Sequence, residues 1–163
     1  MKVDDGNVSD TVFFHYDETN SLVGFSVRGK DYFYDKDILG NINAVIDSQG
    51  TRLVSYSYGD FGETAETVAD SDEARLAARI NPFRFKGYFY DRETGFYYLK
   101  SRYYSPELGR FISADGEIGR VGNTMGMNLY AYCKNNPINL SDEGGNWPSW
   151  VLMSMLICTF LHR

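Results

Sequence analysis

Pairs and triplets of aromatic residues recur every few positions between Asn81 and Gly116, in the stretch NPFRFKGYFYDRETGFYYLKSRYYSPELGRFISADG. Turn-forming residues and charges separate them. Two aromatics at positions i and i+2 lie on the same face of a β-strand, and Asp and Gly favour tight turns. The stretch therefore predicts short strands joined by turns, with tyrosine rings in rows along one face.

The same unit, Tyr-x-Tyr-Asp followed by a glycine-containing turn and an apolar strand, recurs along the chain. Its copies are FHYDETNSLVGF, YFYDKDILGNINAV, YSYGDFGET, GYFYDRETGFYYL and, more loosely, RYYSPELGRFI. A single hairpin is marginally stable, whereas a series of hairpins buries a continuous aromatic face. The fold class expected is mainly β: repeated antiparallel hairpins that form part of a β-shell.

One segment has a different pattern. In ADSDEARLAARI, residues 69–80, acids precede Ala, Leu and Arg, and Ser71 is suited to cap a short helix. Asn81 and Pro82 are expected to end it. The domain organisation expected is hairpins and the helix over 1–80, a second β-module over 81–146, and an apolar tail over 147–163.

The charge balance excludes one class of function. The net charge is −6 and the pI is near 4.9, whereas nucleic-acid binding needs a basic stripe. The first ten residues contain no apolar core of a signal peptide, so no cleavable signal is expected in this chain.

Two long motifs carry a resemblance to a known family. The run YFYDKDILGNINAVIDSQGTRLVSYSYGDFGE resembles the YD repeats of Rhs proteins. The stretch quoted first, with NLYAY and NNPINLSD after it, is similar to the Rhs repeat-associated core domain at the C-terminal end of those proteins. The resemblance spans roughly residues 12–150.

This resemblance implies a function. Rhs proteins, Tc-toxin cocoon subunits and teneurins wind YD hairpins into a large β-shell, and in bacteria the shell encloses a C-terminal toxin used in competition between cells. The core domain closes one end of the shell. The present chain is too short to enclose a toxin, so it is expected to be a fragment or an orphan remnant, secreted or at the bacterial cell surface. Its expected partners are the remainder of the shell and the toxin segment.

The resemblance also implies a candidate catalytic dyad. In many relatives two core-domain aspartates cut the chain after the core, and by motif these correspond to Asp115 and Asp142. Two close carboxylates suit such chemistry because one can stay protonated as the acid while the other activates water. Gly116, Glu143 and Asn146 depart from the family pattern, however, and an alternative is that both aspartates are turn residues. Whether the chain is an enzyme is left open; self-cleavage is the most that it would catalyse.

Other candidates are weaker. His15 and His162 have no partners at metal-ligand spacing, so no metal or other cofactor is expected. Arg102, Arg110 and Arg120 flank tyrosine-rich strands and are expected to stack on rings or pair with acids. Binding of cell-surface carbohydrate by exposed tyrosines remains an alternative function.

The tail WPSWVLMSMLICTFL, residues 147–161, is uncharged. It is shorter than a membrane span requires. A buried or amphipathic helix and the stump of a truncated toxin module are the two readings favoured, with membrane contact as a further alternative. Cys133 and Cys158 are expected to be packed thiols rather than a disulfide.

Overall fold

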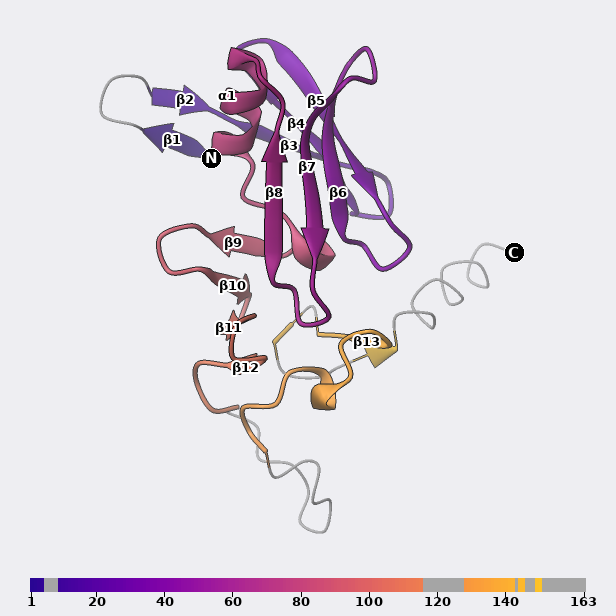
Figure 1. Ribbon diagram of the computed structural model, residues 1–163, viewed down its shortest axis with the longest axis vertical. Helices are drawn as coiled ribbons and strands as arrows, with labels where there is room; N and C mark the ends of the chain where they lie inside the picture. The colour runs from indigo at the N-terminus through magenta and orange to yellow at the C-terminus, as the bar shows by residue number, and fades with distance from the viewer. Residues whose placement is uncertain (5–8, 116–127, 143, 146–148, 151–163) are drawn as a thin grey trace. The chain divides into compact units, whose positions relative to one another are not determined.

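The computed structural model divides into two compact units, which are described separately. The first contains residues 1–57 and 64–87, and the second contains residues 58–63 and 88–163. Strands dominate both, and the described part of the chain has one short α-helix (Figure 1). The predicted mainly-β class and the predicted short helix are therefore confirmed. The structure describes residues 1–4, 9–115, 128–142, 144–145 and 149–150.

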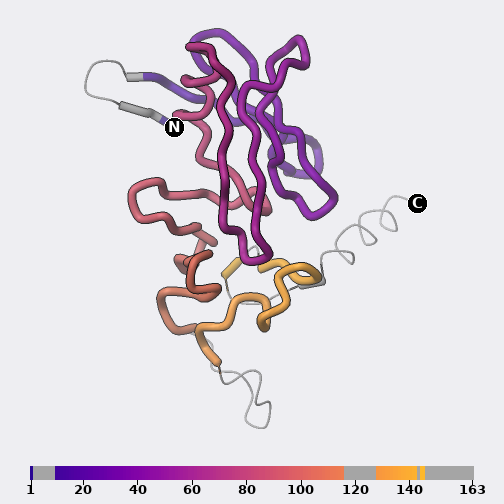
Figure 2. The backbone as a smooth tube through the Cα atoms, in the orientation of Figure 1, coloured from indigo at the N-terminus to yellow at the C-terminus, as the bar shows by residue number. Residues whose placement is uncertain are grey.

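A six-stranded sheet forms most of the first unit, and its strands follow one another in chain order from β3 to β8. The backbone runs back and forth between neighbouring strands, which are antiparallel from β3 to β7 (Figure 2). A separate hairpin, β1 (Lys2–Asp4) with β2 (Ser9–Thr11), precedes it. The strands of the sheet are β3 (Phe13–Tyr16), β4 (Leu22–Val27), β5 (Lys30–Lys36), β6 (Ile42–Asp47), β7 (Arg52–Tyr58) and β8 (Thr64–Val68).

Three of the turns in this sheet are built in the same way. Asp17, Asp37 and Asp47 each accept backbone N–H groups from the residues two and four places further on, at 2.8–2.9 Å. The residue three places on has a positive φ, 61° at Asn20 and 83° at the glycines of the other two turns. Such a turn needs an Asx acceptor at its start and a left-handed residue near its end. The repeat motif predicted this construction, but in the second copy Asp37 opens the turn, because Asp35 of the YFYD run still lies within β5.

Aromatic residues from neighbouring hairpins pack together on the buried face of the sheet. Phe25 of β4 stacks on Tyr32 of β5 with ring centroids 5.0 Å apart, and it lies 5.8 Å from Tyr34. Tyr32 and Tyr34 thus both pack on an aromatic ring of the neighbouring strand, which agrees with the rows of rings expected from the repeat. Gly24 allows the two strands to approach, since a Cβ there would lie 2.2 Å from the carbonyl oxygen of Tyr32.

Helix α1 (Asp72–Ile80) lies against this sheet (Figure 1). Ser71 caps its first turn and accepts a hydrogen bond from the amide of Ala74 at 3.1 Å. The buried face consists of small residues and one Ile: Ala74, Ala77, Ala78 and Ile80. The helix ends at Asn81, as predicted, and a short 3₁₀ turn, η1 (Phe85–Gly87), closes the unit.

The second unit is built on a four-stranded antiparallel sheet in the order β12-β11-β10-β9. A 3₁₀ turn, η3 (Cys133–Asn135), and a small two-stranded sheet follow it. The strands are β9 (Phe89–Asp91), β10 (Phe96–Leu99), β11 (Arg102–Ser105), β12 (Arg110–Phe111), β13 (Leu140–Ser141) and β14 (Ser149–Trp150).

The strand register of this sheet places large side chains in two rows, one on each face. The inner row is Tyr90, Tyr97, Tyr104 and Phe111, and the last three of these are fully buried. The outer row is Phe89, Tyr98, Tyr103 and Ile112, whose exposed fractions are 36%, 42%, 46% and 45%. The predicted tyrosine row therefore exists on the inner face, and a second row lies exposed on the other.

Most of the apolar tail lies outside the described residues, as does the helix considered for it. The exception is Ser149–Trp150, which forms β14 and pairs with Leu140–Ser141 of β13. Within the part of the chain that the structure describes, no helix is long and apolar enough to span a bilayer.

Candidate functional site

A buried arginine organises the polar centre of the second unit. Arg102, the first residue of β11, is 6% exposed and lies with its guanidinium 3.7 Å from the ring centroid of Phe111. One terminal nitrogen pairs with the carboxylate of Asp115 at 2.8 Å, and the other donates to the carbonyl of Leu129 at 2.9 Å. Nε donates to the carbonyl of Gly145. The expected stacking on a ring and pairing with an acid are both present at Arg102.

Burial and neighbouring charge act on this guanidinium in opposite directions. Burial lowers the pKa of Arg102, and the carboxylates of Asp115 and Asp142 raise it. An arginine starts so far above neutrality that it stays charged at physiological pH. Arg102 is therefore a fixed positive charge between two acidic residues.

Asp142 is buried to 1% exposure and is held by backbone contacts. Its Oδ1 accepts the amide of Gly145 at 2.7 Å, and its own amide donates to the hydroxyl oxygen of Tyr88 at 3.1 Å. The hydroxyl of Tyr132 donates to the same oxygen at 3.2 Å. Burial raises the pKa of both Tyr88 and Tyr132, so these hydroxyls remain neutral donors and acceptors.

The chain at Gly144 and Gly145 lies against the turn between β10 and β11. Ser101 Oγ donates to the carbonyl of Gly144 at 2.8 Å. Gly145 has a φ of 78°, and a Cβ there would lie 2.5 Å from Ser101 Oγ and 2.6 Å from the carbonyl oxygen of Leu99. Only glycine fits this approach, because a side chain would clash with backbone and strain the left-handed conformation.

The two aspartates predicted as a dyad are both connected to Gly145. Asp115 reaches its carbonyl through Arg102, and Asp142 accepts its amide directly. Gly116, Glu143 and Asn146, the departures from the family pattern, lie outside the described residues. The role of the aspartates in cleavage stays a prediction. The contact of Arg102 with the Gly145 carbonyl was not foreseen, because nothing in the sequence pattern relates residues so far apart.

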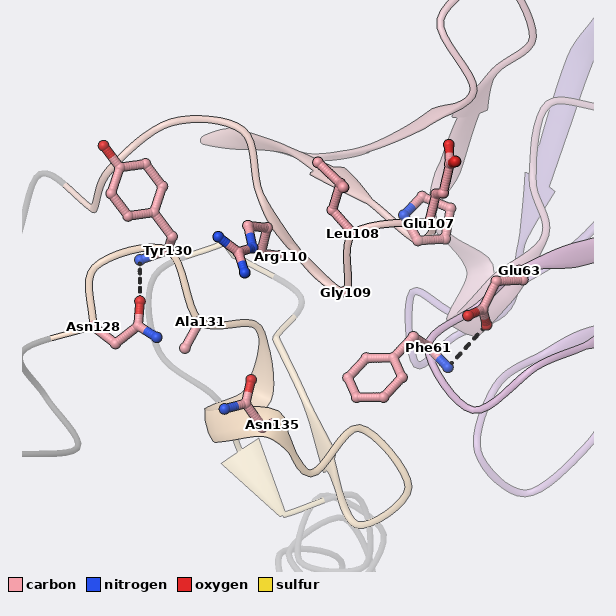
Figure 3. A pocket seen from close by; sticks show the side chains of 11 residues that line it. Phe61, Glu63, Glu107, Leu108, Gly109, Arg110, Asn128, Tyr130, Ala131 and Asn135 are labelled. Atoms are coloured by element: carbon pink, nitrogen blue, oxygen red, sulfur yellow. Dashed lines mark hydrogen bonds between the residues drawn. The ribbon is translucent and has the colours of Figure 1, made fainter.

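A separate pocket of about 340 Å³ lies in the second unit (Figure 3). Phe61 and Glu63 of the β7–β8 turn line one side, and Asn128, Tyr130 and Ala131 line the other. Arg110 and Glu107 add charges of opposite sign to its rim. Its lining among the described residues contains neither Asp115 nor Asp142, so it is not the site of the predicted dyad. No group of three metal-ligating side chains gathers within the described ranges.

Comparison with known proteins identifies the family. Residues 3–138 match the teneurin YD-shell family, which is most of the chain. The chain belongs to the teneurin YD-shell family. The resemblance to Rhs and YD-repeat proteins expected from the sequence is thereby confirmed.

The relatives of this chain include proteins named as a nuclease and as toxin subunits. The tRNA nuclease WapA of Bacillus subtilis strain 168 is 38% identical over 150 residues, which is 92% of this chain and 6% of WapA. Toxin subunit YenC1 of Yersinia entomophaga is 34% identical over 119 residues, 73% of this chain and 11% of that protein. The crystal structure of TcdB2-TccC3-Cdc42 matches with a TM-score of 0.69 at 25% identity, over 85% of this chain and 7% of that one.

This YD-shell chain thus spans a small part of its relatives' length, about 6% of WapA and 11% of YenC1. Its fold is shell-like and is related to that of the Tc-toxin shell and the WapA proteins. The nuclease and toxin functions in the relatives' names are those of the much longer proteins.

Proposed function

We propose that this chain is the closing segment of a bacterial Rhs toxin shell, which encapsulates a C-terminal toxin used in competition between cells. The observation that carries the proposal is the inner aromatic row of β9–β12, whose cross-strand ring contacts continue from one strand to the next. A row of this kind extends by adding hairpins, as a shell wall requires. In this proposal the chain acts as part of a longer protein that is secreted or displayed at the cell surface.

A graft into a relative tests this function. Residues 12–142 would replace the matched segment of Bacillus subtilis WapA, which shares 38% identity with this chain. If the segment closes a shell, the region that follows the graft should resist limited proteolysis to the same extent as the corresponding region of unmodified WapA, which is measured alongside. An Arg102→Ala graft should lose that resistance, because it removes the buried contacts to Asp115 and Leu129. A graft as protease-sensitive as a simple deletion of the segment would contradict the proposal.

Self-cleavage after Gly145 is a second candidate, favoured by the contacts that both aspartates make around that glycine. Attack of water on the Gly145 carbonyl carbon would form a C–O bond and break the C–N bond to Asn146. One carboxylate would take the proton from water, and the other, protonated, would give a proton to the leaving nitrogen. The Arg102 N–H on the carbonyl oxygen would stabilise the negative charge that develops there.

The same contacts also serve a purely structural purpose, since they tie three distant segments to β11. The departures from the family pattern at Gly116, Glu143 and Asn146 favour that structural role. We therefore expect the isolated chain to remain intact.

A further inference from the structure

The pocket of about 340 Å³ in the second unit carries opposite charges on opposite sides. Figure 3 shows the carboxylates of Glu63 and Glu107 on one side and the guanidinium of Arg110 on the other. The ring of Phe61 lies between the two sides. Sites for small ligands typically have volumes of roughly 300–1,000 Å³, so this pocket is at the lower end of that range. A matching ligand is therefore small and carries both charges, separated by an apolar spacer.

The main chain holds the residues on both sides of the pocket in place. Arg110 pairs with Ser105 in the register of β11 and β12, and it forms a further β-bridge with Ala131. On the other side, Oε2 of Glu63 accepts the amide of Phe61 at 3.2 Å within the β7–β8 turn. The backbone of the pocket is thus preformed, which lowers the entropic cost of binding a ligand.

Phe61 provides a fixed aromatic surface in this pocket. A Cβ at Gly109 would lie 3.1 Å from Cδ1 of Phe61, so the glycine allows the ring to pack against the β11–β12 turn. The carbonyl of Phe61 also accepts the hydroxyl of Tyr104 at 2.6 Å, which fixes its backbone. An aliphatic stem can lie on such a ring, and the ring face attracts a nearby cation.

The polar groups around the ring retain bonding capacity. Among the residues that the structure describes, Arg110 and Glu107 form no ion pair, and the side-chain amide of Asn135 forms no hydrogen bond. Asn135 lies on the same side of the pocket as Arg110 (Figure 3). A guanidinium binds a carboxylate through two parallel N–H groups, and a side-chain amide can donate to the same group. This side of the pocket therefore suits a carboxylate.

These features together favour one chemical class of ligand. In Lys and Arg, an aliphatic stem separates the cationic head from the α-carboxylate. At the C-terminus of a peptide that carboxylate is free and the α-nitrogen is a neutral amide. In a free amino acid, by contrast, an ammonium group lies beside the carboxylate and would face Arg110. A ligand with a single charge would leave one side of the pocket unmatched.

We propose that this pocket binds the end of a peptide whose C-terminal residue is Lys or Arg. The α-carboxylate lies against Arg110 and Asn135, the aliphatic stem lies on Phe61, and the cationic head lies beside Glu63 and Glu107. Capture of a chain end in this way is a recurring mode of peptide recognition. The site is independent of shell closure and of self-cleavage.

The test uses Nα-acetyl-L-lysine and the full-length chain at low ionic strength, followed by the backbone amide shifts in NMR spectra. For a ligand of this size we expect a Kd on the order of 1 mM, with the largest shifts at the residues that line the pocket. Nα-acetyl-L-lysine amide lacks the carboxylate, and Nα-acetyl-L-norleucine lacks the cation. Each should bind about fivefold more weakly, as expected for the loss of one partly exposed ion pair.

Substitutions should remove these two preferences separately. Arg110→Gln should abolish the preference for acetyl-lysine over its amide and keep the preference over acetyl-norleucine. The double substitution Glu63→Gln and Glu107→Gln should have the reverse effect. Arg92→Gln and Glu93→Gln are the matched controls, because both residues are exposed in the β9–β10 turn of the same unit and do not line the pocket. Both controls should keep both preferences.

The comparison of the three ligands on the unmodified chain decides the proposal even where a variant fails to fold. No detectable binding, equal binding of the three ligands, or largest shifts away from the pocket would overturn it. Free L-lysine binding more tightly than acetyl-lysine would assign the pocket to a free amino acid and would overturn it as well. Loss of the same preferences in Arg92→Gln or Glu93→Gln would show that the net charge of the unit, and not this pocket, selects the ligand.

Discussion

The two units bury tyrosines from the same repeat motif but satisfy their hydroxyls differently. In the first unit, Asn81 at the end of α1 accepts from Tyr34 at 2.8 Å and donates to Tyr56 at 3.0 Å. In the second unit, Tyr104 and Tyr97 donate to backbone carbonyls of the 58–63 turn, at 2.6 and 3.1 Å. A buried hydroxyl needs a partner in either case, since leaving it unpaired costs about 1–3 kcal/mol.

The difference determines where each unit is vulnerable to mutation. At Tyr34 and Tyr56 the first unit depends on one amide side chain, Asn81, which is fully buried and far from its partners in sequence. At Tyr97 and Tyr104 the second unit uses main-chain carbonyls that no substitution removes, so the contribution of these two residues depends on the volume and packing of their rings.

Truncating the inner row should be the most damaging change. Tyr104 is fully buried, with its ring 4.1 Å from that of Tyr132, so Tyr104→Ala should lower the free energy of unfolding of the second unit by about 4 kcal/mol. The adjacent outer-row substitution Tyr103→Ala should cost about 1 kcal/mol or less. Urea unfolding measures both. Equal losses would show that the two faces of the sheet are not distinct.

Removing the shared amide should rank second. Asn81→Ala leaves the hydroxyls of Tyr34 and Tyr56 without this partner and should cost the first unit about 2 kcal/mol. In a double-mutant cycle with Tyr34→Phe, the two losses should be less than additive, because both changes remove the same hydrogen bond. Strict additivity would mean that Asn81 acts through the helix end alone.

Alkaline pH should weaken the first unit through Tyr32. Burial, followed by the hydrogen bond to Glu73, raises the pKa of Tyr32 from 10.0 to about 12. Because the folded state holds the proton more tightly, this contribution is complete below pH 10 and is lost as pH rises through about 12. In urea midpoints measured from pH 9 to 12, Glu73→Gln should make the loss above pH 10 smaller, because the folded-state pKa of Tyr32 is then raised less above its unfolded value. An unchanged profile would show that Glu73 does not contribute to the shift.

Loss of the turn-opening aspartate, Asp37, should lower the stability of the first unit more than loss of Asp35, two positions earlier in β5. Asp37→Ala removes the acceptor for two turn amides and should cost about 1–2 kcal/mol. Asp35 forms a surface ion pair with Arg52, so Asp35→Ala should cost about 0–1 kcal/mol. Thermal melts of the two variants compare their losses of stability directly. A larger loss for Asp35→Ala than for Asp37→Ala would show that Asp35, and not Asp37, opens the turn.

The smallest expected effect concerns cleavage. Intact-mass measurement of the purified chain should give one species, and Asp115→Asn and Asp142→Asn should leave that result unchanged. Spontaneous loss of the peptide after Gly145, blocked by either substitution, would establish the dyad as active.

Much of this arrangement follows from the sequence because it depends on neighbouring residues. The Asx turns, the strand alternation and the Ser71-capped helix each involve residues within a few positions of one another, and local hydrogen bonding and periodicity specify them. The long RYYSPELGRFISAD and NNPINLSD motifs were sufficient to indicate the family. They could also nominate Asp115 and Asp142, though not their roles.

Only the tertiary structure decided which residues of these local elements are buried and which distant residues they contact. Tyr97 and Tyr98 are adjacent and chemically identical, yet the strand register buries one and exposes the other. Asn81 was expected only to end a helix, and it became the partner of two tyrosines because α1 lies over their sheet. Arg102 contacts Asp115 and Gly145 only because the fold brings three distant segments to the start of β11. Such contacts depend on how long-range strand pairing closes in space, and no local pattern in the sequence encodes that closure.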